Sequence, residues 1–148
     1  MKKFKFSLDT VLKYKDQVLD ALKGEHAAIL VAVREQEDIL EAAWRRYREY
    51  NEEFCAQKLR GLSAMDAMMY QSALRAQELE IQRQTERLDA LRAKEESKRN
   101  EVVEAKKDTA SLEKLRERKL DLYHKGIQKG EEQMIEEFIS TQRAMTSA

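Results

Sequence analysis

The chain has 148 residues, and its 28 basic and 28 acidic side chains cancel to a formal net charge of zero. Such a balance leaves no overall positive field to hold phosphate groups, so we expect no nucleic-acid partner. Proline is absent and only four glycines occur, while 38% of the residues are charged. This composition is typical of long helices and leaves almost no loop on which to build an active site, so we expect no enzymatic activity.

A first helix is predicted over about residues 7–58. Ser7 is placed to cap its N-terminus, and Asp9 puts a negative charge in the first turn. Apolar residues then recur at alternating four- and three-residue steps, the pattern of a coiled-coil seam. The seam positions are Leu8, Leu12, Lys15, Leu19, Leu22, His26, Ile29, Val33, Gln36, Leu40, Ala43, Tyr47, Tyr50 and Phe54.

The pattern breaks at a turn predicted over about residues 59–63. Gly61 suits the left-handed residue that ends a helix, and Ser63 with Asp66 forms a variant of the capping box. A second helix is predicted over about residues 64–142. Its seam positions are Ala67, Tyr70, Leu74, Gln77, Ile81, Gln84, Leu88, Leu91, Glu95, Lys98, Val102, Ala105, Thr109 and Leu112. Two seams joined by a short connection predict an all-α fold, a single long antiparallel two-helix coiled-coil hairpin covering residues 1–148.

The second helix is longer than the first. At a rise of 1.5 Å per residue, the first helix reaches only to about residue 115 of the second. We therefore expect an overhanging C-terminal helix from about Leu115 to Gln142, with the segment Met1–Phe6 near its base. Its apolar residues are Leu115, Leu120, Leu122, Tyr123, Ile127, Met134, Ile135, Phe138 and Ile139. A lone helix that exposes such side chains is an unfilled interface.

Two motifs resemble those of a known family. The chain opens with Phe4-x-Phe6-x-Leu8, followed by Val11-Leu12. Near its C-terminal end stands Leu112-Glu113-Lys114-Leu115-Arg116-Glu117-Arg118-Lys119, then Tyr123, Glu131-Glu132-Gln133 and Glu136-Glu137. Over essentially the whole chain this arrangement resembles the flagellar export protein FliJ family, the soluble stalk component of the bacterial flagellar type III secretion apparatus.

The resemblance implies a non-enzymatic stalk whose paired termini insert into the ring of the hexameric flagellar export ATPase. It also implies contacts with the membrane-embedded export gate, through the far end of the hairpin, and with export chaperones. The implied location is the cytoplasm, peripheral to the inner membrane at the flagellar base.

The same resemblance favours two partner-binding surfaces. For the ATPase ring the candidates are Arg116, Arg118, Lys119, Tyr123, Glu132 and Glu136; guanidinium groups bind carboxylates with two hydrogen bonds. For the export gate they are Tyr47, Tyr50, Tyr70 and Leu74, since aromatic residues are enriched at interfaces. Without the resemblance, each surface has a simpler interpretation. The ATPase-ring candidates could form a solvated charged helix face, and the export-gate candidates could be ordinary coiled-coil packing.

Other functions stay open from the residues alone. One is the coiled-coil stalk of a related secretion or rotary ATPase machine. Another is a peripheral membrane-associated coiled coil, anchored by the aromatic and basic residues of the N-terminal segment, Lys2, Lys3, Phe4, Lys5 and Phe6. We expect no cofactor or metal, because His26 and His124 have no ligand-spaced companions and Cys55 has no histidine near it in the sequence.

Overall fold

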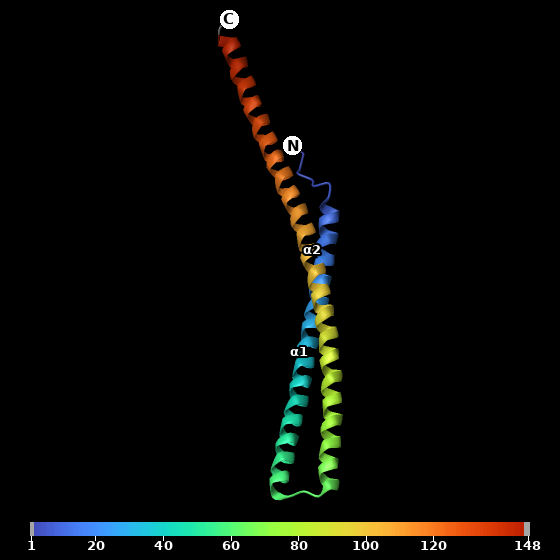
Figure 1. The fold of residues 1–148 in the computed structure, drawn as a ribbon. Coiled ribbons are helices and arrows are strands. Elements are labelled where there is room, and N and C mark those ends of the chain that lie inside the picture. The colour runs from blue at the N-terminus through green and yellow to red at the C-terminus, as the bar shows by residue number, and fades with distance from the viewer. Residues whose placement is uncertain (1, 147–148) are drawn as a thin grey trace. The chain divides into compact units, whose positions relative to one another are not determined.

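The computed structural model describes residues 2–146, so Met1 and residues 147–148 lie outside the described part. Two helices make up nearly all of it: α1 spans Asp9–Arg60 and α2 spans Ala64–Thr146 (Figure 1). They pack against each other as an all-α helical hairpin, as predicted. The described residues contain no strand.

The start of α1 differs from the expectation. The amide of Leu12 donates to the carbonyl of Leu8 (2.8 Å), and the amide of Asp9 closes a preceding turn onto the carbonyl of Phe6 (3.1 Å). The first helical carbonyl therefore belongs to Leu8, which takes the cap position one residue later than the predicted Ser7. Because leucine has no side-chain acceptor, the preceding turn, rather than a side-chain cap, sets where α1 begins.

The contacts divide the chain into two compact units, which we describe separately. The hairpin unit is Ala21–Val102. The terminal unit consists of the residues up to Asp20 together with those from Val103 onward. Each unit contains a stretch of α1 and a stretch of α2.

In the hairpin unit the chain reverses at residues 61–63. Gly61 has a φ of 100°, which L-residues with a side chain rarely adopt, and its amide donates to the carbonyl of Lys58 (3.2 Å). The Ser63 hydroxyl accepts from the amide of Asp66 (3.1 Å) and so caps the start of α2. Both features follow the sequence-based expectation for this turn.

The core of the hairpin unit lies along the two predicted seams. Its buried apolar residues are Val33, Ala43, Phe54, Leu74, Ile81, Leu88 and Val102, all seam positions. Among residues 2–146, no large side chain is sealed completely from solvent. Stability therefore comes from many half-buried contacts spread along the seam, each contributing at most about 1.5–3 kcal/mol.

Polar residues also occupy the seam of the hairpin unit. Gln36 is buried, and its amide donates to the side-chain oxygen of Gln84 (2.6 Å) and to the carbonyl of that residue (3.0 Å). His26 Nε2 lies 2.9 Å from Glu95 Oε1. Polar seam pairs of this kind satisfy each other in only one alignment of the helices, so they define the register.

In the terminal unit, the first turns of α1 pack on α2. Phe6, Leu12 and Leu19 are buried there, and Lys15 forms an ion pair with Asp108 of α2 (3.7 Å). Beyond this packing α2 continues as an unbroken helix to Thr146. From residue 131 to residue 146 every described residue is exposed, and no second element runs beside this end of α2 (Figure 1).

Candidate partner-binding surfaces

The exposed end of α2, residues 131–146, is amphipathic; we call it the overhang. Met134, Phe138 and Met145 share one face and are 71%, 63% and 76% exposed. Ile135 and Ile139 extend this apolar surface and are exposed as well. Large apolar side chains gathered on one face of a helix are normally buried against a partner.

The predicted acidic site residues Glu132 and Glu136 also lie in the overhang. Each is two residues from Met134, a turn of about 200° around the helix axis, so they face away from it. Both are exposed, and within residues 2–146 neither forms an ion pair. Glu132 and Glu136 thus point away from Met134, whereas Glu131 and Glu137, three residues before and after it, flank the apolar side.

The predicted basic residues Arg116, Arg118 and Lys119 are all exposed on α2. The ion pairs of the described terminal unit join residues 9–15 and 104–108 only, so none of these three cations has a carboxylate partner there. An unpaired exposed guanidinium is available to a carboxylate of another protein.

The predicted residue Tyr123 contacts the segment before α1, residues 2–6, which we call the N-terminal arm. Its ring lies 5.6 Å from the ring of Phe4, and its hydroxyl donates to the carbonyl of Lys2. The guanidinium of Arg116 stands 5.8 Å from the Phe4 ring centre. The arm therefore covers part of the helix that the sequence predicted to project alone from Leu115.

The arm also changes the account of the N-terminal aromatic residues. Phe6 is only 7% exposed, and Phe4 packs against Tyr123. A membrane anchor needs aromatic side chains that are free to enter the headgroup region. Both of these rings are instead engaged with the protein's own surface.

The gate candidates lie together near the turn of the hairpin unit. The ring of Tyr70 packs between those of Tyr50 (5.1 Å) and Phe54 (5.0 Å), and Leu74 is buried. The Tyr47 hydroxyl donates to Glu78 (2.9 Å). These contacts join α1 to α2, so the predicted aromatic residues hold the end of the hairpin unit together.

Two tyrosine hydroxyls in this group have a raised pKa. The pKa of Tyr47 is raised above 10.0, chiefly by the hydrogen bond to the Glu78 carboxylate. The pKa of Tyr70 is raised mainly by burial, with a further contribution from the charge of Glu53. Each shift reports a neutral phenol held beside an acidic group.

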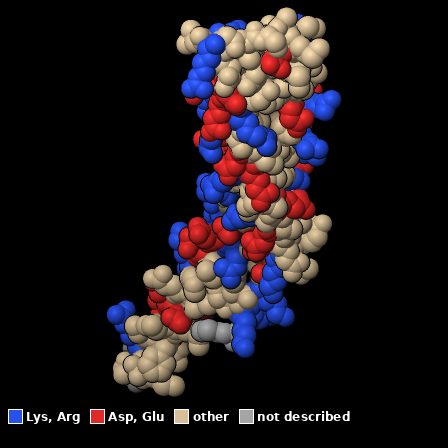
Figure 2. All heavy atoms as spheres, turned by 90° about the horizontal axis from the view of Figure 1, so that it is seen from below, with Lys and Arg blue, Asp and Glu red and all other residues tan. Residues whose placement is uncertain are grey.

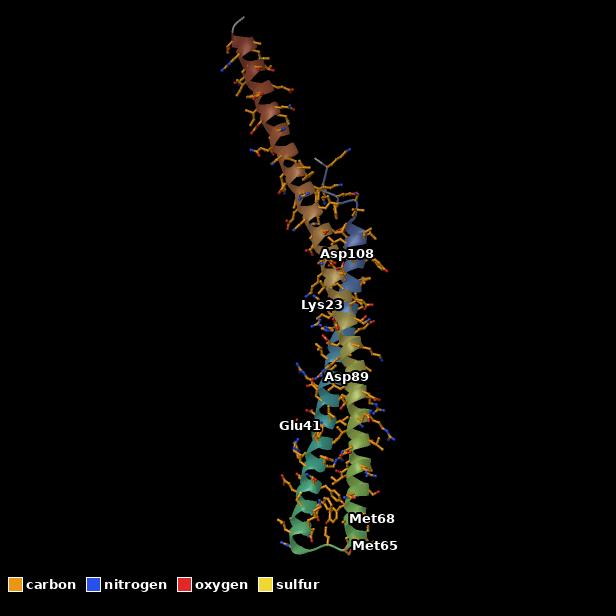
Figure 3. The ribbon with its side chains drawn as sticks, in the orientation of Figure 1. Lys23, Glu41, Met65, Met68, Asp89 and Asp108 are labelled. Carbon is orange, nitrogen blue, oxygen red and sulfur yellow. The ribbon has the colours of Figure 1, made fainter. Side chains whose placement is uncertain are left out.

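Apolar side chains around the turn are more accessible than the predicted tyrosines. Leu59 is 91% exposed, and Met69 is exposed on the first turns of α2. Met65 and Met68 are exposed there as well (Figure 3). Trp44 is also exposed and meets Tyr47 edge-on at 5.9 Å. Leu59 was not predicted from the sequence as a surface residue. Its exposure could have been inferred because it lies outside the seam and between two basic residues, Lys58 and Arg60.

The remaining surface is mixed in charge. Basic and acidic side chains alternate over the face that Figure 2 presents. Within residues 2–146 no three His, Cys, Asp or Glu side chains come together in a way that could hold a metal ion. Neither helix, over its described length, contains a stretch apolar enough to cross a bilayer.

Comparison with known proteins identifies the family of the chain. A family model described as "Flagellar FliJ protein" matches residues 4–148, nearly the whole chain. No curated protein and no solved structure matches the chain.

Proposed function

The chain belongs to the flagellar FliJ protein family, a non-catalytic component of flagellar protein export, and we propose that it acts there as a stalk. In this role it threads the ring of the hexameric export ATPase and also contacts the export gate and export chaperones. It works in the cytoplasm, beside the inner membrane at the flagellar base.

The overhang carries this proposal. It is a single helix with Met134, Ile135 and Phe138 exposed on one side and Glu132 and Glu136 on the other. A partner that lies beside a helix covers only one of these faces. A ring that closes around the helix contacts all of them at once, which suits a helix that is amphipathic yet fully exposed.

The basic residues at the base of the overhang support the same role. Arg116, Arg118 and Lys119 point in several directions around α2 and have no ion-pair partner among the described residues of the terminal unit. Cations distributed around a helix suit a ring whose subunits each offer acidic groups. We assign Tyr123 to this surface as the residue that anchors the N-terminal arm beside it.

For the export gate we propose the turn end of the hairpin unit. Tyr47, Tyr50, Tyr70 and Leu74 give this end its shape, and the exposed Trp44 and methionines around them supply adaptable apolar contact. A peripheral position at the membrane then follows from contact with the gate, since Phe4 and Phe6 are engaged within the protein.

The test of ring binding is the double variant Arg116→Glu with Arg118→Glu. We expect it to lose co-purification with the hexameric ATPase while circular dichroism shows unchanged helicity, because both side chains are exposed. Arg75→Glu with Arg87→Glu is the matched control: it reverses two exposed arginines of the hairpin unit that form no ion pair among the described residues. If the Arg116/Arg118 variant co-purifies with the ATPase as well as the wild type does, this surface does not bind the ATPase.

A further inference from the structure

The N-terminal arm and Tyr123 of α2 form an open hollow of about 730 Å³ on the surface, lined by Lys2, Lys3, Phe4, Lys5 and Tyr123. We infer that this hollow is a binding site for an acidic peptide segment of a partner protein. The inference depends on the proposed function in one respect: it takes the acidic segment to belong to the ATPase ring.

The arm is held in place by aromatic contacts. Phe4 packs on Tyr123, the hydroxyl of Tyr123 donates to the carbonyl of Lys2, and Phe6 is buried where the arm meets the first turn of α1. These contacts fix the backbone of the arm at Lys2, Phe4 and Phe6. The side chains of Lys2, Lys3 and Lys5 therefore extend from one short stretch of backbone next to α2. Phe4 and Tyr123 are thus positioning residues for the cations.

The charge of the site is unbalanced. Lys2, Lys3 and Lys5 are exposed, and none forms an ion pair among residues 2–146. On α2, Arg116 and Lys119 lie seven and four residues before Tyr123, so they share its face of the helix. Three lysines therefore line the hollow beside two aromatic rings, and Arg116 and Lys119 add positive charge on the same face of α2. This charge complements a peptide with several acidic side chains.

A peptide fits this site better than a membrane surface does. A bilayer would require the rings of Phe4 and Phe6 to point outward, whereas both are packed against the protein. A peptide needs only the concave floor and the surrounding cations. Arg118, although in the same basic block, lies two residues from Arg116 and about 200° away around the axis, so it is outside the site.

The test measures binding of a fluorescent octa-glutamate peptide to the purified protein by anisotropy, at two salt concentrations. The variant Lys2→Gln, Lys3→Gln, Lys5→Gln should bind about tenfold more weakly and show a shallower salt dependence, since each exposed ion pair contributes modestly. Lys23→Gln, Lys94→Gln, Lys106→Gln removes three other exposed lysines that form no ion pair among the described residues and should keep wild-type affinity.

Two further variants test the geometry. Lys119→Gln should weaken peptide binding and Arg118→Gln should not, because only Lys119 shares the face of Tyr123. Phe4→Ala should also weaken binding, with recovery in Phe4→Tyr, which keeps an aromatic ring at the contact. Equal effects of Lys119→Gln and Arg118→Gln would overturn the site, as would wild-type affinity in the triple arm variant.

The same experiment also tests two other hypotheses: that the arm binds a lipid surface, and that the chain binds the ATPase ring as a stalk. Vesicles containing phosphatidylglycerol should not bind the protein; binding to vesicles but not to the peptide would overturn the inference in favour of a lipid surface. Capture of the ATPase is measured in parallel. If the wild-type protein binds the peptide but not the ATPase, the proposed stalk function is wrong and the acidic-peptide site stands. If it binds the ATPase but not the peptide, the acidic-peptide site is wrong and the proposed stalk function stands.

Discussion

The buried amide of Gln36 donates to the side-chain oxygen of Gln84 across the seam of the hairpin unit, at 2.6 Å. Gln84 in turn donates to Glu80 on its own helix (2.7 Å). A polar network in an otherwise apolar seam is satisfied in a single alignment, because sliding one helix along the other separates the two amides.

This pair predicts an asymmetry between single and double variants. Gln36→Leu alone leaves the side-chain oxygen of Gln84 without its donor and should lower the free energy of unfolding by about 1–3 kcal/mol. Gln36→Leu with Gln84→Leu should recover most of that loss, since neither polar group then lacks a partner. Urea denaturation of the wild type, the two single variants Gln36→Leu and Gln84→Leu, and the double variant measures the coupling; additive losses would show that the two amides act independently.

The turn glycine predicts a contrast with a helical one. Gly61 has a φ of 100°, so Gly61→Ala should destabilise the protein by about 1–2 kcal/mol. Gly24 lies within α1, and an added Cβ would meet nothing within 4 Å, so Gly24→Ala should stabilise it by about 0.5–1 kcal/mol. Thermal unfolding of the two variants and the wild type measures both changes in stability. A Gly61→Ala variant more stable than the wild type would contradict the left-handed conformation of Gly61.

The raised pKa of Tyr47 predicts a change in alkaline stability. The folded protein holds the phenolic proton more tightly than the unfolded chain does, so this group contributes stability below pH 10 that is lost as the pH rises through its folded value. Glu78→Gln removes the charge beside the hydroxyl and should lower the pKa of Tyr47 toward 10.0.

Tyrosine absorbance titration measures that shift, with Tyr47→Phe to assign the signal. The same Glu78→Gln variant should lose less stability than the wild type as the pH rises above 10, because the pKa of its Tyr47 then differs less between the folded and unfolded states. An unchanged titration curve would mean that the hydrogen bond between Tyr47 and Glu78 does not form in solution.

Much of this fold could be predicted from the residue pattern. The alternation of three- and four-residue steps identified the seam, and residues such as Leu19, Val33, Leu74 and Leu88 are buried as that pattern requires. The turn followed from Gly61 and Ser63. These features depend on local spacing and backbone preference, which a single sequence records.

The surfaces depended on contacts that local spacing does not record. The packing of Phe4 on Tyr123 joins residues more than a hundred positions apart, and nothing in either neighbourhood specifies it. Tyr70 follows the seam spacing, and the structure adds that its ring packs against those of Tyr50 and Phe54 of the other helix. The projection of α2 beyond α1 was predictable from the difference in helix length, whereas the packing of the arm on α2 at Tyr123 was not.

The central claim is that a ring closes around the overhang, and the variant Met134→Ser with Phe138→Ser tests it most directly. Both side chains are exposed, so the free energy of unfolding should stay within about 0.5 kcal/mol of the wild type. Glu132→Gln with Glu136→Gln changes the other side of the same helix, which a surrounding ring also contacts. The account predicts that both variants lose affinity for the hexameric ATPase; wild-type affinity in the Met134/Phe138 variant, or a loss confined to it, would contradict a ring that closes around the helix.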